Sequence, residues 1–419
     1  MIVLTRVFAK VLLGMSGALC LIFFVPPVAA GPYADSAHGN TTYGVLRDWS
    51  PQSTPYLQGN CAHCHEQHSS IDGSEPPPVG GAASGFLLLA DGFSEKENNL
   101  YSETDNVCFQ CHRTTGSLQL GGITDFNYNY STTFGGSTST GEVDSIMAAF
   151  NLASYHNLYD IKRFITGAIG SKSFSNFPAS SNPCSGCHNV HLARYNKRTP
   201  GDPTYTALSR PSDHNNLWGN DTSPNERMTV YGTAYQPPYY WGSMNLEPDG
   251  LSNDRAAQAE KIPDYNTFCI DCHNATNTIW STTLNRNLRT FNWSLEMHGA
   301  GTAKNNPRAQ MNLPYVEASI GTYLLSCLDC HEPHGSANQY LIRNSVNKNT
   351  VTLPLDSTDW DELCASCHLP TTELKQFHHA VPPTDFACSD CHVSADRAAG
   401  IHDCTNCHYH GSADSYKTF

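Results

Sequence analysis

A short cysteine-rich stretch decides the fold of this chain: Asn60-Cys61-Ala-His-Cys64-His65-Glu-Gln-His68. Its central unit, Cys-x-x-Cys-His, occurs eight times in 419 residues and uses sixteen of the seventeen cysteines. These sixteen are Cys61, Cys64, Cys108, Cys111, Cys184, Cys187, Cys269, Cys272, Cys327, Cys330, Cys364, Cys367, Cys388, Cys391, Cys404 and Cys407. Because the spacing is the same in every unit, we expect one chemical role for all of these thiols and no framework of disulfides.

The repeated unit is the attachment sequence of c-type haem. Two thiols on one tight turn can form thioethers with the two vinyl groups of a porphyrin, and the histidine that follows projects its imidazole at the iron. Zinc sites and dithiol redox sites also use Cys-x-x-Cys, but neither requires a histidine after every second cysteine. We therefore expect eight covalently attached haem c groups, whose irons have as first ligands His65, His112, His188, His273, His331, His368, His392 and His408.

The second axial ligand decides what each iron can do. An iron with both axial positions filled transfers electrons, whereas an open position can bind and transform a substrate. Twelve histidines lie outside the first-ligand positions, but only five methionines follow residue 30, so methionine cannot serve all eight irons. The sequence therefore predicts histidine as the second ligand throughout.

The position of each histidine predicts which of them are second ligands. We expect His38, His68, His156, His191, His298, His334, His379 and His402. Three of these, His68, His191 and His334, stand three residues after the histidine of their own unit, so close to their own haem that each should turn to a different iron. The choice between His378 and His379 stays open. Structural roles are expected for the remaining histidines, His63, His214 and His410.

The first thirty residues are typical of an export signal. Arg6 and Lys10 precede an apolar run at 11–25, and Val28-Ala29-Ala30 forms a small-residue cleavage site before Gly31. A retained membrane anchor is the alternative. We expect removal of 1–30 and a secreted protein, extracellular or at the cell surface, without a membrane span. The formal net charge of −14 argues against a nucleic-acid or anionic-membrane partner, since either requires a basic face.

The composition offers little material for an ordinary core. Only 39% of residues are hydrophobic and 15% are charged, with 31 glycines and 25 prolines. We expect residues 31–419 to form a single octahaem cytochrome domain: mostly irregular coil with short helices wrapped around a chain of haems, and little sheet. Residues 364–419 are the haem-dense C-terminal segment. The spacers 121–141 and 199–250 should be loops, and a helix is expected between residues 144 and 159.

Three stretches carry a family resemblance: Asn60 to His68, Asn182 to His191 and Leu325 to Ser336. They resemble the multihaem outer-surface cytochromes that polymerise into extracellular filaments, the cytochrome nanowires of metal-reducing microbes. The resemblance covers motif order from about His38 to Ser336. The chain departs from it in the crowded segment from Cys364 to His410, which holds three more attachment units.

This resemblance implies bis-histidine haems stacked in alternating parallel and T-shaped pairs, with little regular secondary structure. It also implies a homopolymer in which a histidine of one subunit ligates a haem of the next, and His68 matches that bridging ligand. We expect long-range electron transfer without chemistry on a substrate, from redox partners at the cell envelope to an extracellular metal or mineral acceptor. The alternatives are an octahaem oxidoreductase acting on small nitrogen or sulfur compounds and a monomeric electron carrier.

Overall fold

The computed structural model describes the chain in segments that begin near the expected mature N-terminus. These are residues 32–36, 38–42, 44–47, 56–65, 85–120, 143, 145–168, 177–188, 190–191, 269–298, 312, 327–347, 349–357, 360–368 and 408–412. The leader, both long spacers, and the ligand candidates His68, His379 and His402 lie outside these segments, as do Cys388, Cys391, His392, Cys404 and Cys407. The single-domain organisation of residues 31–419 stays a prediction.

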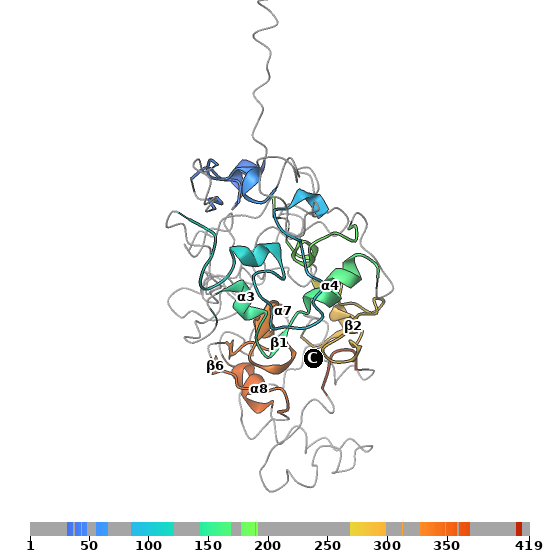
Figure 1. Cartoon of the computed structure of the whole chain (residues 1–419). Coiled ribbons are helices and arrows are strands. Elements are labelled where there is room, and N and C mark those ends of the chain that lie inside the picture. The colour runs from blue at the N-terminus through green and yellow to red at the C-terminus, as the bar shows by residue number, and fades with distance from the viewer. Residues whose placement is uncertain are drawn as a thin grey trace, which may run out of the picture.

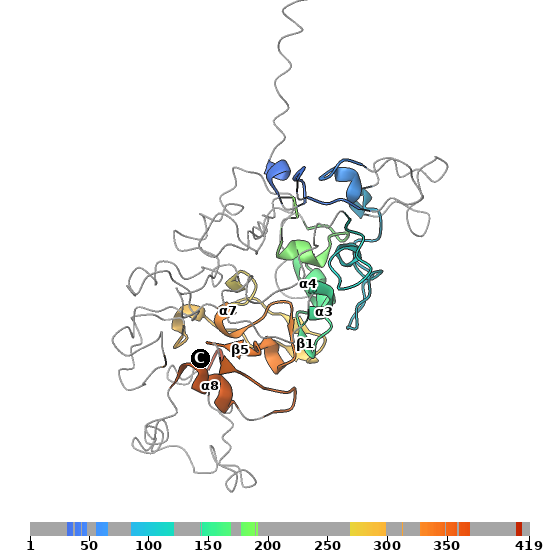
Figure 2. The same cartoon turned by 90° about the vertical axis from the view of Figure 1, so that its left-hand side faces the viewer.

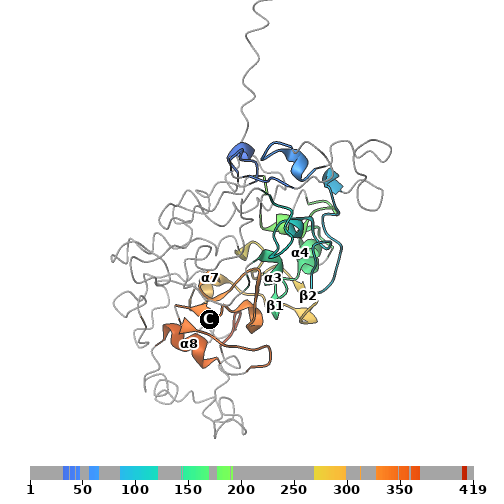
Figure 3. The ribbon, with the colours of Figure 1, turned by 60° about the vertical axis from the view of Figure 1, so that its left-hand side comes forward.

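The described segments follow one another in space roughly as they do in sequence. Residues near 32–47 lie at one end of the described part, helices α3 and α4 lie in the middle, and α8 lies towards the other end (Figures 1 and 2). A third view, turned about the same vertical axis, shows the same order (Figure 3). The six attachment units in these segments are therefore spread along the described part of the chain and do not converge on one centre.

Regular structure is short throughout the described segments. The α-helices are α3 (Ile146–Ala149), α4 (Leu158–Ile165), α7 (Cys327–Cys330) and α8 (Asp361–Cys367). The 3₁₀ helices are η1 (Pro32–Asp35), η2 (Cys61–His63), η4 (Gly85–Leu87), η5 (Val107–Gln110), η6 (Pro183–Gly186), η9 (Trp293–Leu295) and η12 (Gln339–Leu341). This scarcity agrees with the expected coil-rich architecture.

The strands are two residues long and pair only as antiparallel ribbons in the described segments. The pairs are β1 (Ser154–Tyr155) with β4 (Gly335–Ser336), β2 (Trp280–Ser281) with β3 (Arg286–Asn287), and β5 (Ser345–Val346) with β6 (Asn349–Thr350). The β1–β4 pair joins segments that are far apart in sequence, with Tyr155 opposite Gly335. It therefore brings His156, which follows β1, beside His334, which precedes β4.

The helix expected between residues 144 and 159 is confirmed as α3, which is shorter than this segment. The chain leaves α3 at Phe150, passes through β1 and begins α4 at Leu158. A second start signal explains where α4 begins: the Asn157 side chain accepts hydrogen bonds from the backbone N–H groups of Tyr159 (2.9 Å) and Asp160 (3.3 Å). Asparagine is a strong helix N-cap, so α4 forms as a separate element. His156 consequently lies in extended chain between β1 and α4.

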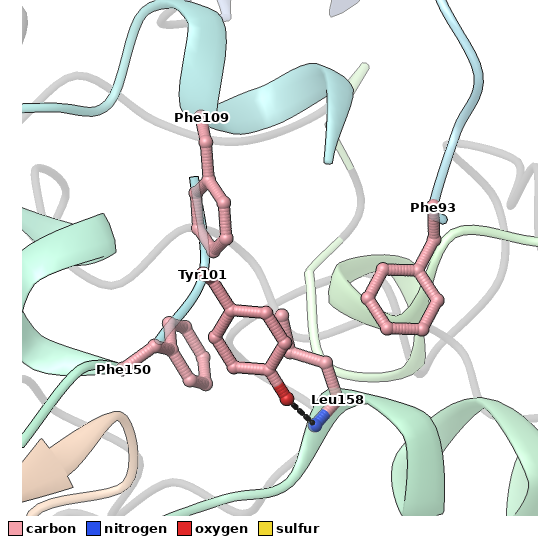
Figure 4. Close-up of a cluster of buried hydrophobic side chains, with 5 residues drawn as sticks. All are labelled: Phe93, Tyr101, Phe109, Phe150 and Leu158. Carbon is pink, nitrogen blue, oxygen red and sulfur yellow. Dashed lines mark hydrogen bonds between the residues drawn. The ribbon is translucent and has the colours of Figure 1, made fainter. Parts of the chain in front are cut away.

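Apolar side chains collect in small clusters. One consists of Phe93, Tyr101, Phe109, Phe150 and Leu158, and the Tyr101 hydroxyl accepts a hydrogen bond from the Leu158 backbone N–H at 3.3 Å (Figure 4). A second contains Phe164, Ile165 and Phe177, and a third contains Ile342, Val346, Val351, Leu353 and Trp360. Phe109 is a spacer residue of the second attachment unit, so this cluster fixes that unit directly.

Within the described segments, no helix combines the length and apolarity needed to cross a bilayer.

Candidate haem-attachment sites

Each described Cys-x-x-Cys-His unit closes into one helical turn. In all six units whose backbone is described, the N–H of the histidine donates to the carbonyl of the first cysteine at 2.8 to 3.0 Å. Residues three apart in such a turn project from the same side, so the two thiols and the imidazole are presented together. The twelve cysteines of these described units are not joined in disulfides, and burial removes Cys64 and Cys187 from water.

Asparagine side chains start the attachment turns of the first three units. The amide oxygens of Asn60, Asn106 and Asn182 accept from the backbone N–H of the residue two positions later, at 2.9, 3.0 and 2.9 Å respectively. Asparagine is among the strongest helix N-caps. These caps hold turns that are too short to be stable alone.

Histidines from elsewhere in the chain face the histidines of the attachment units. The pairs, with the distance between ring centres and the angle between ring planes, are His65 with His191 (6.2 Å, 13°), His112 with His38 (6.1 Å, 90°), His188 with His334 (6.0 Å, 11°), His273 with His156 (6.0 Å, 40°), His331 with His410 (6.3 Å, 38°) and His368 with His298 (6.2 Å, 37°). Every described first-ligand candidate except His408 appears in this set. Five of the six partners are histidines that the sequence predicts as second ligands.

The spacing of these pairs fits a shared iron. Two nitrogen–metal bonds of about 2 Å each, plus about 1 Å from each nitrogen to its ring centre, give about 6 Å between ring centres. Imidazole is a common ligand of iron. Elsewhere in the described segments, no three His, Cys, Asp or Glu residues gather as they would around a bare metal ion. The donor set therefore suits haem, in which the porphyrin supplies the remaining ligands.

Hydrogen bonds at Nδ1 orient several of these rings. Because a carbonyl oxygen only accepts, Nδ1 carries the proton in the rings bonded to carbonyls: His38 to Val190 (2.9 Å), His65 to Phe86 (2.9 Å), His331 to Tyr340 (2.9 Å) and His156 to Pro333. Two further rings bond to buried carboxylates, His334 to Glu332 (3.1 Å) and His410 to Glu296 (3.3 Å). Such contacts fix the tautomer in which Nε2 is the metal ligand.

Burial keeps these imidazoles neutral. Removal from water disfavours the charged form and lowers the pKa of His112 to about 4, His188 to about 3, His191 to about 4, His273 to about 3, His298 to about 3 and His331 to about 4. Burial also lowers the pKa values of His38, His156 and His368. A neutral imidazole has the lone pair that iron ligation requires.

His63 has the environment of a structural histidine. It is fully buried, its Nδ1 accepts from the Arg47 backbone N–H (3.3 Å), and its Nε2 donates to the Leu57 carbonyl (3.0 Å). With both ring nitrogens engaged by the backbone, the ring ties residues 47 and 57 to the first attachment unit. This agrees with the structural role expected from the sequence.

His410 differs from its expected structural role, because it faces His331. The sequence held a signal for this. A histidine placed two residues after His408 is as close to its own haem as those placed three residues after theirs, so the same argument directs it to another iron. The sequence analysis also missed the carboxylates Glu296 and Glu332, whose positions become informative only when their histidine neighbours are known.

Neighbouring attachment turns contact each other through their first cysteines. The Cys108 and Cys184 side chains are neighbours, and so are those of Cys269 and Cys327. The second and third turns are also joined through their caps, since Asn182 donates from Nδ2 to Asn106 Oδ1 at 2.9 Å. Units two and three, and units four and five, therefore lie side by side.

The histidine pairs follow one another in the order of their units. Rings of successive pairs lie near enough that a proton on one would lower the pKa of the other: His38 beside His191, His334 beside His112 and His156, and His410 beside His273 and His298. These contacts link the first pair to the second and continue without a break to the sixth. The described sites form a series in chain order.

Comparison with known proteins gives one match. A family model described as a doubled CXXCH motif matches residues 325–352, which contain the fifth attachment unit. No curated protein matches the chain. No solved structure matches it either. The family match and the repeated units support a multihaem c-type cytochrome that binds haem c covalently and functions in electron transfer.

Proposed function

We propose that this chain carries eight bis-histidine haem c groups and conducts electrons over long distances outside the cell, as the subunit of a polymeric cytochrome filament. The observation that carries the proposal is the series of paired imidazoles. In six pairs the distance between ring centres varies only from 6.0 to 6.3 Å, while the angle between ring planes ranges from 11 to 90°.

A constant distance with a free angle is what coordination along one axis produces. Metal–nitrogen bonds fix the separation of two rings but leave each ring free to rotate about the bond. Direct aromatic contacts reach similar separations, as between Tyr101 and Phe109 (6.1 Å, 47°), so the ring type matters as well: each of the six pairs consists of two imidazoles, which can bind the same iron. The ring centres are 6.1 Å apart in the pair His112–His38 and 6.0 Å apart in the pair His188–His334. The angle between the two ring planes is 90° in the first pair and 11° in the second.

The chain's residues have three tasks in this function. The cysteines of each turn attach the porphyrin, the histidine of the turn supplies one axial nitrogen, and a histidine from another segment supplies the second. Haem iron with two imidazole ligands supplies a one-electron couple of low potential and no open coordination position. The irons of His392 and His408 take their proposed second ligands from among His68, His379 and His402, as the sequence predicts.

The filament and its acceptor are the parts of the proposal that rest on the sequence. The resemblance to cytochrome nanowires supports a homopolymer joined by His68 ligation to a neighbouring subunit. The export signal supports location at the cell surface or beyond it. An excess of 38 acidic over 24 basic side chains favours cationic partners, so ferric minerals or metal ions suit as terminal acceptors.

Spectroscopy of the purified holoprotein separates electron transfer from catalysis. We expect eight covalent haems by intact mass, a fully low-spin ferric spectrum, and no spectral change when carbon monoxide is added to the reduced protein. A high-spin ferric signal together with binding of carbon monoxide or nitrite would contradict the proposal and favour an octahaem enzyme. A mass that corresponds to fewer haems would contradict the assigned number.

Negative-stain imaging tests the filament. We expect filaments from the native protein, loss of filaments with unchanged haem content in His68→Met, and normal filaments in the matched control His214→Met. Unchanged filaments in His68→Met would refute the placement of the joint. Discrete particles from the native protein would refute the polymer and leave a monomeric electron carrier.

A further inference from the structure

The C-terminal turn at residues 408–412 is attached to the segment around η9 by several side-chain contacts. The Arg289 guanidinium lies 3.9 Å from the centre of the Tyr409 ring, in cation–π geometry. The Phe291 ring stacks on His410 with centres 4.9 Å apart and planes at 26°. Two neighbouring residues of the turn are thus held by two neighbouring side chains of the same segment.

A buried carboxylate fixes the turn from the other side. Glu296 is 1% exposed; its Oε1 accepts from the Gly411 backbone N–H at 2.9 Å, and its Oε2 accepts from His410 Nδ1 at 3.3 Å. Gly411 has φ +77° and passes so close to the Thr290 carbonyl that a side chain would overlap it. The turn therefore needs glycine at this position and the carboxylate beside it.

These contacts aim His410 at the fifth attachment unit. Its ring centre lies 6.3 Å from that of His331, close to the 6.0 to 6.2 Å of the other five pairs. His331 is itself oriented by its Nδ1 hydrogen bond to the Tyr340 carbonyl at 2.9 Å. In this pair both rings thus have a hydrogen-bonded Nδ1.

We propose that His410 is the second axial ligand of the fifth haem iron, supplied by the C-terminal segment of the same chain, and that Glu296 is its positioning residue. This inference rests on the haem occupancy proposed above. It gives the haem-dense C-terminal segment a task beyond its own attachment units, since the segment completes a site that lies earlier in the chain.

Glu296 also adjusts the electronic character of the ligand. A carboxylate that accepts the Nδ1 proton makes the imidazole a stronger donor, which stabilises ferric over ferrous iron. Three of the other pairs have a backbone carbonyl in that place on one ring, at His38, His65 and His156. The fifth site should therefore have a lower potential than an equivalent site without the carboxylate.

The assignment also constrains the filament joint. With His410 opposite His331, three predicted ligands, His68, His379 and His402, remain for the two irons of His392 and His408. If His379 and His402 both bind in their own chain, no iron of a neighbouring subunit needs His68. A His68 bridge therefore requires that one of those two histidines is not a ligand.

Matched glutamine variants of the holoprotein test the proposal. In His410→Gln we expect unchanged haem mass, a high-spin signal from about one haem in eight, and carbon monoxide binding to that one. His214→Gln removes a histidine that lies outside every attachment unit and is expected to be structural, and its spectrum should stay fully low-spin. A low-spin His410→Gln protein that binds no carbon monoxide would overturn the proposal. If the native protein already contains high-spin haem or fewer than eight haems, the proposed function fails instead.

Two further variants apply if His410→Gln folds poorly. His410→Met should replace one bis-histidine haem by a His/Met haem, with the near-infrared band of that ligation and a higher potential. Glu296→Gln should keep all haems low-spin and raise the reduction potential of one haem. We expect its ferric-to-ferrous ratio at a fixed potential to change at least tenfold, which corresponds to about 59 mV for one electron. No methionine-ligated haem in the first and unchanged potentials in the second would refute the assignment.

Discussion

At single residues, the acceptor of the Nδ1 proton distinguishes otherwise similar histidines. Most described contacts of this kind end on backbone carbonyls, but His334 bonds to Glu332, which is fully buried. The same Glu332 oxygen accepts from the His334 backbone N–H at 3.2 Å. One carboxylate therefore fixes both the ring and the backbone of His334, the proposed ligand that faces His188.

Replacing this carboxylate should raise the potential of the third haem. Glu332→Gln removes a negative charge that stabilises the ferric state, while its amide oxygen can still accept from His334. We expect an upward shift on the order of 60 mV, a tenfold change in the ferric-to-ferrous ratio, in one haem by spectroelectrochemical titration. Glu362→Gln, an exposed substitution in α8, serves as the control. Identical titrations for both variants and the native protein would contradict the tuning role.

Burial of neutral histidines makes stability depend on pH. The pKa values of His188, His273 and His298 fall to about 3 in the folded chain from an ordinary value of 6.5. Below pH 6.5 the unfolded chain therefore binds more protons than the folded chain, and the unfolding free energy falls as pH is lowered. For each histidine the fall is about 1.4 kcal/mol per pH unit between its folded and its unfolded pKa. Denaturant titrations should show this fall between pH 6.5 and 5, before carboxylates titrate. A constant midpoint across that range would contradict it.

At the scale of elements, the attachment turns depend on their caps and on each other. Asn106 is fully buried, caps η5 through the Cys108 N–H, and exchanges amide hydrogen bonds with Asn182 at 2.9 and 3.4 Å. Its Nδ2 also lies 3.6 Å from the Cys184 thiol. A single side chain thus starts one attachment turn and holds the next one beside it.

Loss of this amide should cost more than loss of an ordinary cap. Removing an N-cap costs about 1 kcal/mol, and leaving a buried polar partner unsatisfied costs about 1–3 kcal/mol more. We expect Asn106→Ala to lower the unfolding free energy by about 2–4 kcal/mol. Asn292→Ala, which removes the exposed cap of η9, should cost about 1 kcal/mol. Equal losses for the two variants would show that the Asn106–Asn182 contact contributes nothing.

The ribbon of β1 and β4 depends on a close backbone approach. A Cβ atom at Gly335 would overlap the Ala149 carbonyl, which is backbone and cannot turn aside. Gly335→Ala should therefore cost about 1–3 kcal/mol and shift the ribbon that places His156 and His334. Thermal unfolding and the spin state measure the two effects. Gly92→Ala is the control, since its nearest neighbours lie at 3.7 Å, and an equally stable Gly335→Ala protein would contradict this packing.

At the scale of the whole molecule, the repeated units predict more than the spacers do. The spacing Cys-x-x-Cys-His determines the local turn, so the attachment geometry follows from sequence. His38, His156, His191, His298 and His334 lie opposite attachment histidines as the ligand count predicts, although their role as ligands stays a prediction. Their order could not be predicted, because which distant segments meet depends on contacts such as the β1–β4 pairing.

Two outcomes show what the sequence did not specify. Apolar residues in 144–159 indicated a helix, which α3 confirms, but they did not indicate that Asn157 begins a second one. A structural role was expected for His410 because it follows His408 closely, whereas the structure places it opposite His331 with a hydrogen bond to Glu296, 114 residues earlier in the chain. In both cases a polar side chain decided the geometry, and an apolar pattern contains no information about it.

The proposed function requires the six histidine pairs of the described segments to hold irons in chain order. Cryo-electron microscopy of the native holoprotein, at a resolution that shows both axial ligands of each iron, tests this most directly. We expect the first six irons in chain order to lie between His65 and His191, His112 and His38, His188 and His334, His273 and His156, His331 and His410, and His368 and His298. An iron among these with an open axial position, or with a different second ligand, would contradict the pairing.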